Sequence, residues 1–304
     1  MRCLVTGASG FIGQNLCKYL SDQGYQITTL GRTNLNGDHI YTKSYDHENI
    51  SSSILGKKYD VLFHLTAAGV NPKDRDSSNL EEVNLKLPAK LVNLCANQGI
   101  KTFIMSGSSA EYSTHLTTKP KTETDPLNRN DLYGKTKAIG GLKALKAGKK
   151  RNITTLVLRL FNVYGPGESA HRLLPSLLRG IKRDEKIKMS QGNQIRDFIH
   201  VLDVCRAMEI ASIKSLSNQI SSGAYNICTG TGNSVASFAN IVCQQSKVPV
   251  SILNIGAIPL RPNEPNNLVG TAKKFTQATG WHPSINLERG INLEINFHKR
   301  KMYE

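Results

Sequence analysis

At 304 residues the chain can bury a large core, in one large domain or two modest ones. Its 39% hydrophobic and 20% charged residues exclude a disordered chain, and no apolar run approaches the roughly 20 residues that span a bilayer. The net charge of +16 would suit a nucleic-acid partner, but the basic residues are dispersed and no nucleic-acid motif accompanies them. We therefore expect a solvated basic surface that attracts anionic small molecules, with no nucleic-acid partner and no membrane span.

The six cysteines are widely spaced and form no C-x-x-C pair. This pattern predicts free, mostly buried thiols and no metal centre, as in proteins of a reducing compartment. The N-terminal segment MRCLVTGASGFIG lacks a small-residue cleavage site after its apolar stretch, so we interpret it as a first strand rather than a secretory signal. A cytoplasmic protein is expected.

Short apolar runs alternate with amphipathic stretches in the first half of the chain. Strands are predicted at residues 2–6, 26–30, 60–65, 102–106 and 154–159, and helices at residues 11–23, 80–97 and 133–147. This alternation predicts an α/β fold, a Rossmann-type doubly wound parallel sheet with helices on both faces.

The pattern changes after residue 160. Gly, Pro and polar loops separate apolar stretches at residues 173–181, 201–211 and 234–245. We expect residues 1–160 to form a dinucleotide-binding domain and residues 161–304 a smaller, mostly helical substrate lobe. The apolar segment 224–228 is strand-like and is expected to return to the sheet of the first domain.

Three glycines, Gly7, Gly10 and Gly13, lie between the first predicted strand and the first predicted helix. In this context they permit a tight turn, close approach of the backbone to a pyrophosphate, and close helix-to-strand packing. The helix N-terminus then directs free N–H groups and a positive dipole end at the phosphates. The sequence therefore predicts a site for an NAD-type dinucleotide.

The second predicted strand ends without the acidic residue that usually accepts a hydrogen bond from the ribose 2′-OH of NAD. Arg32 lies there instead, and its guanidinium is suited to the 2′-phosphate of NADP. NADP(H) is therefore favoured, and NAD(H) stays possible. Asp46, after the next expected strand, is a candidate for contacting the adenine.

Tyr133 and Lys137 are four positions apart at the start of a predicted helix, so they lie on one face of it. The lysine is expected to lower the pKa of the phenol, which could then exchange a proton with a substrate oxygen. Ser108 follows the strand predicted at 102–106 and could give that oxygen a second hydrogen bond. With the N-terminal glycines, these three residues indicate a dehydrogenase site.

Six motifs follow one another in order: TGASGFIG (6–13), DVLFHLTAA (60–68), SGSSAEY (106–112), YGKTK (133–137), LRLFNVYGPG (158–167) and RDFIHVLDV (196–204). Together they resemble the extended short-chain dehydrogenase/reductases that act on nucleotide sugars. The resemblance covers nearly the whole chain and implies hydride transfer at C4 of the nicotinamide. It implies Tyr133 as the acid/base, Lys137 as a further grip on the nicotinamide ribose, and Ser108 as the residue that orients the substrate.

Further site residues follow from the same resemblance, which implies a nucleotide-diphosphate sugar as the substrate. Cofactor contacts are implied for Phe11, Ile12, Leu65, Thr66 and Ala67, which lie in the first two motifs. Asn162, Arg196 and Arg261 match positions that grip the diphosphate, and a guanidinium suits that task because it offers a bidentate fork. Arg172 lies where the family has a polar residue near the sugar nucleotide.

Neighbouring positions narrow the reaction. The 4,6-dehydratases of this family carry an Asp-Glu pair where this chain has Ser109 and Ala110, so dehydration is disfavoured. Glu111 comes one place later and is expected to be a structural or solvent-facing acid. Reductases that also epimerise C3 and C5, such as GDP-fucose synthase, use a Cys and a His where this chain has Ala110 and Arg172.

Two reactions remain, and the cofactor separates them. NADPH-dependent reduction of the 4-keto group of a nucleotide-activated 6-deoxy-4-ketohexose is favoured, because Arg32 indicates a dissociating NADPH. The C-terminal half is also similar to that of CDP-abequose synthase and related reductases. An NAD-dependent 4-epimerase is the alternative. A non-enzymatic dinucleotide sensor would keep the glycines and lose Tyr133, so it is disfavoured.

A homodimer is also expected, formed by the helices predicted at residues 80–97 and 133–147. Leu87, Leu91, Leu142 and Leu145 supply more apolar surface than one contact with a sheet requires, and a two-fold helix bundle would bury it.

Replacing Arg32 with alanine is expected to weaken NADPH binding by about 1–3 kcal/mol, with little change for NADH, because only NADPH carries the 2′-phosphate. Fluorescence titration of the two reduced cofactors measures the difference. An equal loss for both cofactors, or a parent protein that prefers NAD, would contradict the NADP prediction and favour the epimerase.

Overall fold

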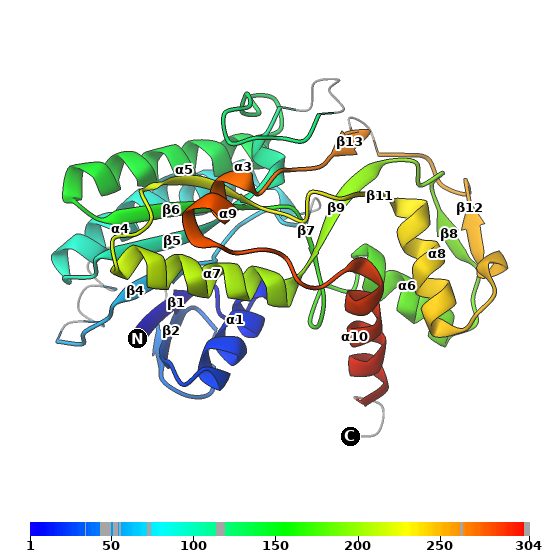
Figure 1. Ribbon diagram of the computed structural model, residues 1–304, viewed down its shortest axis with the longest axis horizontal. Helices are drawn as coiled ribbons and strands as arrows, with labels where there is room; N and C mark the ends of the chain where they lie inside the picture. The colour runs from blue at the N-terminus through cyan, green and yellow to red at the C-terminus, as the bar shows by residue number, and fades with distance from the viewer. Residues whose placement is uncertain are drawn as a thin grey trace.

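The main element of the protein is a seven-stranded parallel sheet (Figure 1). A computed structural model describes residues 1–33, 35–42, 50, 54, 56–71, 74–113, 119–261 and 264–300. The strands are β1 (Arg2–Thr6), β2 (Gln26–Gly31), β3 (His39–Tyr41), β4 (Val61–His64), β5 (Thr102–Ser108), β6 (Thr154–Leu160) and β10 (Gly223–Ile227). Their order in the sheet is β10-β6-β5-β4-β1-β2-β3, so the predicted Rossmann-type fold is confirmed. The segment predicted at 224–228 does return to this sheet, parallel to β6.

Both faces of the sheet are covered, which explains the continuous apolar character of its strands. In β1, Cys3 and Val5 belong to the apolar cluster on one face, whereas Leu4 between them belongs to the cluster on the other. Helices α1 (Phe11–Asp22) and α7 (Val201–Leu216) pack on the first face. Helices α4 (Leu87–Asn97) and α5 (Leu132–Arg151) pack on the second.

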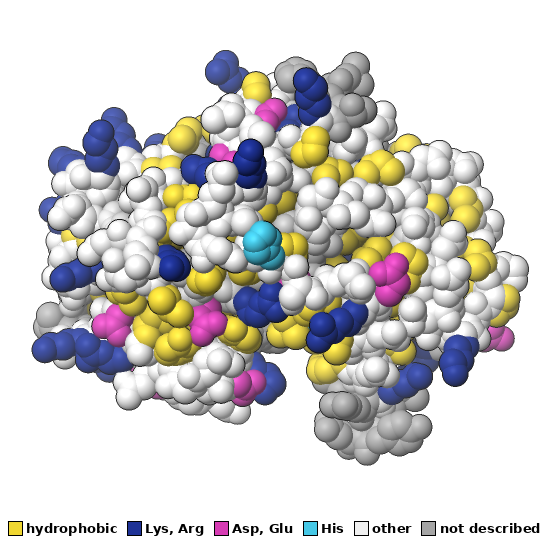
Figure 2. Space-filling view, in the orientation of Figure 1, with side chains coloured by type: hydrophobic (Ala, Val, Ile, Leu, Met, Phe, Trp, Pro, Cys, Tyr) yellow, Lys and Arg dark blue, Asp and Glu magenta, His cyan; other side chains and the backbone are white. Residues whose placement is uncertain are grey.

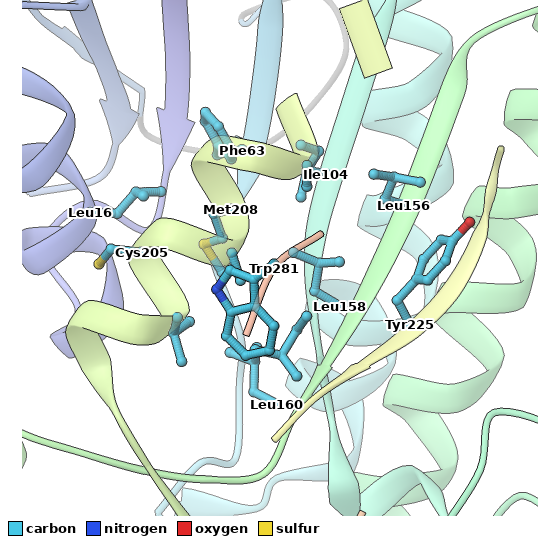
Figure 3. Packing of buried hydrophobic residues seen from close by; sticks show 14 of the residues in the cluster. Leu16, Phe63, Ile104, Leu156, Leu158, Leu160, Cys205, Met208, Tyr225 and Trp281 are labelled. Carbon is cyan, nitrogen blue, oxygen red and sulfur yellow. The ribbon is translucent and has the colours of Figure 1, made fainter. Parts of the chain in front are cut away.

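The C-terminal part of the chain contributes to this core as well. α7 lies against the sheet beside α1, although the sequence pattern placed it in the smaller lobe. After α9 (Lys273–Thr279), Trp281 inserts its indole among Met208, Leu158 and Leu160 (Figure 3). The first domain is therefore completed by segments that follow the start of the lobe.

The smaller lobe combines helices with two small sheets. Its helices are α6 (Leu173–Lys182), α8 (Val235–Ser246) and α10 (Leu287–Arg300), and a short 3₁₀ turn, η4, spans Val250–Ile252. Its strands are β7 (Asn162–Tyr164), β8 (Ile187–Met189), β9 (Ile195–His200), β11 (Gly232–Ser234), β12 (Leu253–Ile255) and β13 (Asn267–Leu268). β9 pairs with β7, β11 and β13, and β8 pairs with β12. These short strands lacked a clear alternating pattern, so the sequence did not predict the sheets.

The helix predicted at 80–97 starts earlier and contains an irregular segment. A short helix, α3 (Ser77–Leu80), leads into a π-helical segment, η2 (Glu81–Lys86), and then into α4. Wider turns of this kind are rare and shift the side chains that follow out of the usual register. In η2 the shift directs Asn84 inward, where its side chain is buried.

Helix α5 approaches its neighbours closely, because glycines lie at its contact points. A Cβ at Gly134 would overlap the carbonyl of Ala110, and one at Gly140 would overlap the carbonyl of Asn84. Glycines weaken a helix interior by roughly 0.5–1 kcal/mol each relative to alanine. Here they allow backbone-to-backbone contact with the segments that carry Ser108 and Asn84.

Two of the four leucines expected at a dimer interface are part of the core. Leu87 and Leu91 are only 2% and 1% exposed and pack under α4. The expectation that they supply spare apolar surface is therefore wrong, since the sheet already covers them. Leu142 on α5 is 51% exposed, and Leu145 is partly buried.

Surface charge and thiols agree with the sequence analysis. Lys and Arg side chains are spread over several parts of the face in Figure 2 and do not gather in one patch there. All six cysteines are free, and five of them are buried, as predicted. Within the described residues, no helix is both long and apolar enough to cross a membrane.

Candidate active site

The glycine turn lies at the carboxyl edge of the sheet, between β1 and α1. Gly7 has a φ of +74°, and a Cβ there would lie 2.5 Å from the backbone nitrogen of Thr66. A Cβ at Gly13 would overlap the Gly7 carbonyl, whereas a Cβ at Gly10 would have only that carbonyl, at 3.3 Å, within 4 Å. The fold itself therefore demands glycine at 7 and 13. Gly10 instead keeps the surface of the turn open to a ligand.

The start of α1 fits a dinucleotide pyrophosphate. Gly10 is the N-cap and offers no side-chain hydrogen bond to the helix, and the first turn carries no acidic residue. Phe11 and Ile12 therefore begin the helix with N–H groups directed outward, where a phosphate could accept from them. The sequence-predicted turn and the observed geometry agree.

Leu65, Thr66 and Ala67 follow β4 directly, next to the glycine turn. β1 pairs with β4 on one side and β2 on the other, and the Leu65 N–H donates to the Thr6 carbonyl at 3.0 Å. The strand order reverses between β1 and β4, and ligands of open α/β sheets bind at such a switch point. These three predicted cofactor residues thus lie where a dinucleotide would cross the sheet edge.

Arg32 lies just beyond the end of β2 and its side chain is exposed. This position is next to the glycine turn, since β2 pairs with β1 in register up to Leu30 opposite Thr6. Asp46, the candidate for the adenine contact, lies outside the described residues.

The structure brings Ser108, Tyr133 and Lys137 together. Ser108 is the last residue of β5 and the N-cap of the short 3₁₀ helix η3 (Ser109–Glu111). Tyr133 lies in the first turn of α5 and shares a side-chain hydrogen bond with Ser108. Lys137 is only 2% exposed, and its ammonium donates to the Ser106 carbonyl at 2.6 Å. The predicted serine, tyrosine and lysine therefore form one site at the end of β5.

Burial is the largest influence on the pKa of Tyr133, and it raises that pKa above the ordinary phenol value. The negative charge of Glu111 acts in the same direction. The hydrogen bond with Ser108 and the positive charges of Arg75 and Arg172 lower the pKa, but they do not reverse the shift. At neutral pH Tyr133 is therefore a protonated phenol, able to donate.

Burial also dominates the titration of Lys137. It lowers the pKa of this ammonium to about 8, and the charge of Glu111 opposes that shift. The lowering of the Tyr133 pKa by Lys137, expected from the sequence, is not found. The physical reason is that the helix face carrying both residues is desolvated, which disfavours the phenolate more than nearby cations favour it.

Two residues that the sequence analysis missed help to shape the site. Asn84 accepts from the Ala68 N–H at 2.9 Å and donates to the Ala68 carbonyl at 3.0 Å and to Thr136 at 3.4 Å. It thereby ties the segment after β4 to α5. The sequence offered one signal for it, because Asn84 is a polar residue next to the apolar stripe of the helix predicted at 80–97.

Arg75 is the second missed residue. Its guanidinium lies over the Tyr133 ring, 5.2 Å from the centroid, and donates to Asp131 at 2.7 Å. A guanidinium over an aromatic face is attracted by the ring quadrupole, typically by about 0.5–1 kcal/mol at an exposed site. No motif in the sequence marked this arginine, because the contact depends on the path of the loop after β4.

Glu111 is not a solvent-facing acid. It is 0% exposed, and its carboxylate pairs with Arg159 at 2.8 Å. The expectation of strand alternation is wrong here, since Glu111 belongs to η3 rather than to a strand. The structural role that the sequence analysis also allowed is the one that agrees with its contacts.

The residues predicted to bind the substrate diphosphate lie on β7, on β9 and in the segment before β13. Arg196 is buried and donates to the Pro265 carbonyl at 2.8 Å and to Glu264 at 2.8 Å. Arg261 is exposed, and its carbonyl accepts from the Glu264 N–H at 3.2 Å. Asn162 begins β7, opposite Phe198 of β9, so it lies one strand away from Arg196. Phe198 packs against Phe238 in the lobe core, as the sequence analysis expected.

Arg172 is the N-cap of α6 and lies close enough to Tyr133 to lower its pKa. It forms an ion pair with Glu168 at 3.1 Å. Burial raises the pKa of Glu168 to about 7, partly offset by Arg172. The smaller lobe therefore brings a positive charge toward Tyr133.

Residues 3–228 match the model of the NAD dependent epimerase/dehydratase family, and the chain belongs to this family. It is 25% identical to UDP-glucose 4-epimerase of Rhizobium meliloti, over 98% of this chain and 97% of the relative. It is 27% identical to CDP-abequose synthase of Salmonella typhimurium, over 95% of each chain. Its structure is similar to that of MoeE5 in complex with UDP-glucuronic acid and NAD (TM-score 0.85, 25% identity, 99% of this chain and 100% of that chain). The protein is thus an enzyme of a nucleotide-sugar family with an NAD-binding Rossmann domain.

Replacing Tyr133 with phenylalanine is expected to lower turnover by about 100-fold or more, because the proton donor is lost while the ring is kept. Binding of cofactor and nucleotide sugar should change little. Steady-state kinetics and cofactor titration measure the two effects.

Tyr59→Phe is the matched control, since Tyr59 precedes β4 at the opposite edge of the sheet and its hydroxyl has no hydrogen-bond partner among the described residues. Turnover of Tyr133→Phe within a few-fold of that of the control would contradict the assigned role.

Proposed function

We propose that the protein reduces the 4-keto group of a nucleotide-activated 6-deoxy-4-ketohexose with NADPH. The observation that carries the proposal is the grouping of Ser108, Tyr133 and Lys137 at the end of β5, beside a glycine turn whose neighbouring strand β2 is followed by Arg32. Reduction of a carbonyl requires a proton donor, and a raised pKa keeps the phenol protonated at neutral pH. A dehydratase would need an acid and a base at 109 and 110, where this chain has Ser109 and Ala110.

Tyr133, Ser108 and Lys137 would each have a separate role in the reduction. Bound NADPH would supply the hydride to C4 of the sugar. Tyr133 would donate its phenolic proton to the C4 oxygen as that oxygen gains charge, and the Ser108 hydroxyl would hold the same oxygen. Lys137 would hold the nicotinamide ribose and stabilise the phenolate that Tyr133 becomes.

The substrate diphosphate would lie between the two parts of the chain. Arg196 and Arg261 are proposed to neutralise it, with Asn162 as an amide donor. Arg196 is already paired with Glu264 and the Pro265 carbonyl, so substrate binding would require its fork to exchange one of these partners. Arg172 would face the sugar, because it lies near enough to Tyr133 for its charge to lower the pKa of the phenol.

A 4-epimerase is the second candidate, and two findings favour it. UDP-glucose 4-epimerase is among the relatives that the chain matches over nearly its full length, and MoeE5 was solved with NAD. An epimerase would retain the dinucleotide and oxidise C4 before reducing it from the other face. The Arg32 position and the similarity to CDP-abequose synthase support the reductase instead.

The proposed function predicts oxidation of NADPH, followed at 340 nm, when GDP-, CDP-, dTDP- and UDP-6-deoxy-4-keto sugars are offered in turn. At least one should be reduced with a kcat/KM above about 10⁴ M⁻¹s⁻¹, an ordinary value for an enzyme. Conversion of UDP-glucose to UDP-galactose without added NADPH, and no turnover of any 4-keto sugar, would establish the epimerase and overturn the reductase.

We also propose that the protein is a cytoplasmic homodimer, with Leu142 of α5 near the two-fold axis because it is 51% exposed on this helix. Light scattering at moderate salt should give about twice the 33.4 kDa chain mass. Leu142→Asp should produce a monomer. The matched control is Ile213→Asp, which changes a similarly exposed apolar residue on α7 and should leave the dimer intact. A parent protein that stays monomeric as salt and concentration are raised would rule the dimer out.

A further inference from the structure

A buried ion pair lies directly behind the catalytic serine. Arg159 of β6 donates from Nε to Oε2 of Glu111 at 2.8 Å, and both side chains are at most 5% exposed. The other oxygen, Oε1, accepts from the backbone N–H of Ser108 at 2.8 Å. A single carboxylate therefore joins the end of β5 to β6 through two charge-assisted hydrogen bonds.

The turn that carries Ser108 is built around this carboxylate. Ser108 and Glu111 form a reciprocal capping box, in which the serine hydroxyl accepts from the Ala110 N–H at 3.1 Å. A Cβ at Gly107 would lie 2.6 Å from Glu111 Oε1, so only glycine at this position avoids a clash with the carboxylate. The backbone and the hydroxyl of Ser108 are thus both oriented by η3.

Arg159 is anchored on its other side as well. Its guanidinium donates to the Tyr112 hydroxyl at 3.0 Å and to the Glu123 carbonyl at 3.3 Å. The Tyr112 hydroxyl in turn donates to Asn226 of β10 at 2.6 Å. The network therefore runs from the edge strand of the sheet to the serine, and rotation of Glu111 would break it at its centre.

We propose that Glu111 is a positioning residue for the catalytic centre: clamped by Arg159, it fixes Ser108 against Tyr133 and supplies the negative charge that balances Lys137. The inference rests on the proposed roles of Ser108, Tyr133 and Lys137, and it holds whether the reaction is a reduction or an epimerisation. Glu111 acts through these residues and makes no contact with the reacting atoms.

The charges around the two titrating groups make this role measurable. Tyr133 faces Glu111 and Ser108 from η3, Arg75 from the segment after β4, Arg172 from α6, and Lys137 from its own helix. Lys137 faces Glu111 and, on β4, His64. Glu111 is the one acid among the influences on either group in the described part of the chain, and it raises the pKa of both.

Replacing Glu111 with glutamine keeps the side-chain shape and removes the charge. The amide must present a donor to either Arg159 or the Ser108 N–H, so one of the two hydrogen bonds is lost. We expect kcat to fall by about 10- to 100-fold, as for other small displacements of a catalytic group, while KM for both substrates changes by less than about three-fold. Glu123→Gln is the matched control, because it removes an acid from the same groove without touching Ser108.

A second readout needs no substrate. In stopped-flow pH jumps, the ultraviolet absorbance of phenolate is compared between each protein and its Tyr133→Phe counterpart, which isolates the ionisation of Tyr133. Because Glu111 raises the pKa of Tyr133, the phenolate should form at lower pH in Glu111→Gln than in the parent or in Glu123→Gln. Failure to reduce any 4-keto sugar would leave this titration unaffected, so the two proposals can fail separately.

A groove of about 470 Å³ adjoins Glu111 and Arg159, so water can reach the arginine when its partner is neutral. Circular dichroism shows whether Glu111→Gln folds. If it does not, the double variant Glu111→Leu, Arg159→Met removes both charges, and proteins often tolerate the replacement of a buried ion pair by apolar residues. It should show the same shift of the Tyr133 titration. An unshifted titration in the folded variant, or a kcat within about three-fold of the Glu123→Gln control, would overturn the positioning role.

Discussion

The catalytic site depends on the close contact between helix α5 and the turn after β5. Glycine at 134 and at 140 lets the α5 backbone touch the carbonyls of Ala110 and Asn84. With any larger residue the helix would be held farther from β5, and Tyr133 would lose its hydrogen bond with Ser108. The two glycines lower the intrinsic helix propensity of α5, but they make this close contact possible. Close backbone contact at these two glycines therefore helps to set the position of Tyr133.

That contact has an electrostatic consequence. It leaves Tyr133 partly buried and Lys137 almost fully buried, and desolvation rather than mutual attraction dominates both pKa shifts. Glu111 is buried nearby, where Arg159 pairs with its carboxylate and hydrogen bonds satisfy both of its oxygens. The fold thus brings together a phenol with a raised pKa (Tyr133), an ammonium with a lowered pKa (Lys137) and a buried acid (Glu111). Shifted pKa values such as those of Tyr133 and Lys137, side by side at a sheet edge, are typical of an active site.

The family shares one scaffold among several reactions, and this chain shows how few positions separate them. The Rossmann sheet and the glycine turn suit the binding of a dinucleotide, whichever reaction follows. The reaction itself depends on the side chains around the substrate, and at positions 109 and 110 this chain has Ser and Ala rather than acidic residues. Arg32 follows the end of β2, where NAD-binding folds usually carry an acid. Function in this family is therefore read from the site and not from the fold.

The sequence by itself determined the sheet, the glycine turn and the identity of the serine, tyrosine and lysine. These features depend on local patterns, such as apolar runs of strand length and residues spaced one helical turn apart. Only the tertiary structure decided where α7 packs, that Leu87 and Leu91 are core residues, and that Glu111 is buried against Arg159. It also decided that Arg75 lies over Tyr133, and that burial raises the pKa of the phenol. Each of these depends on contacts between segments far apart in the chain, and neither the periodicity nor the spacing of a sequence records the solvent that such contacts exclude.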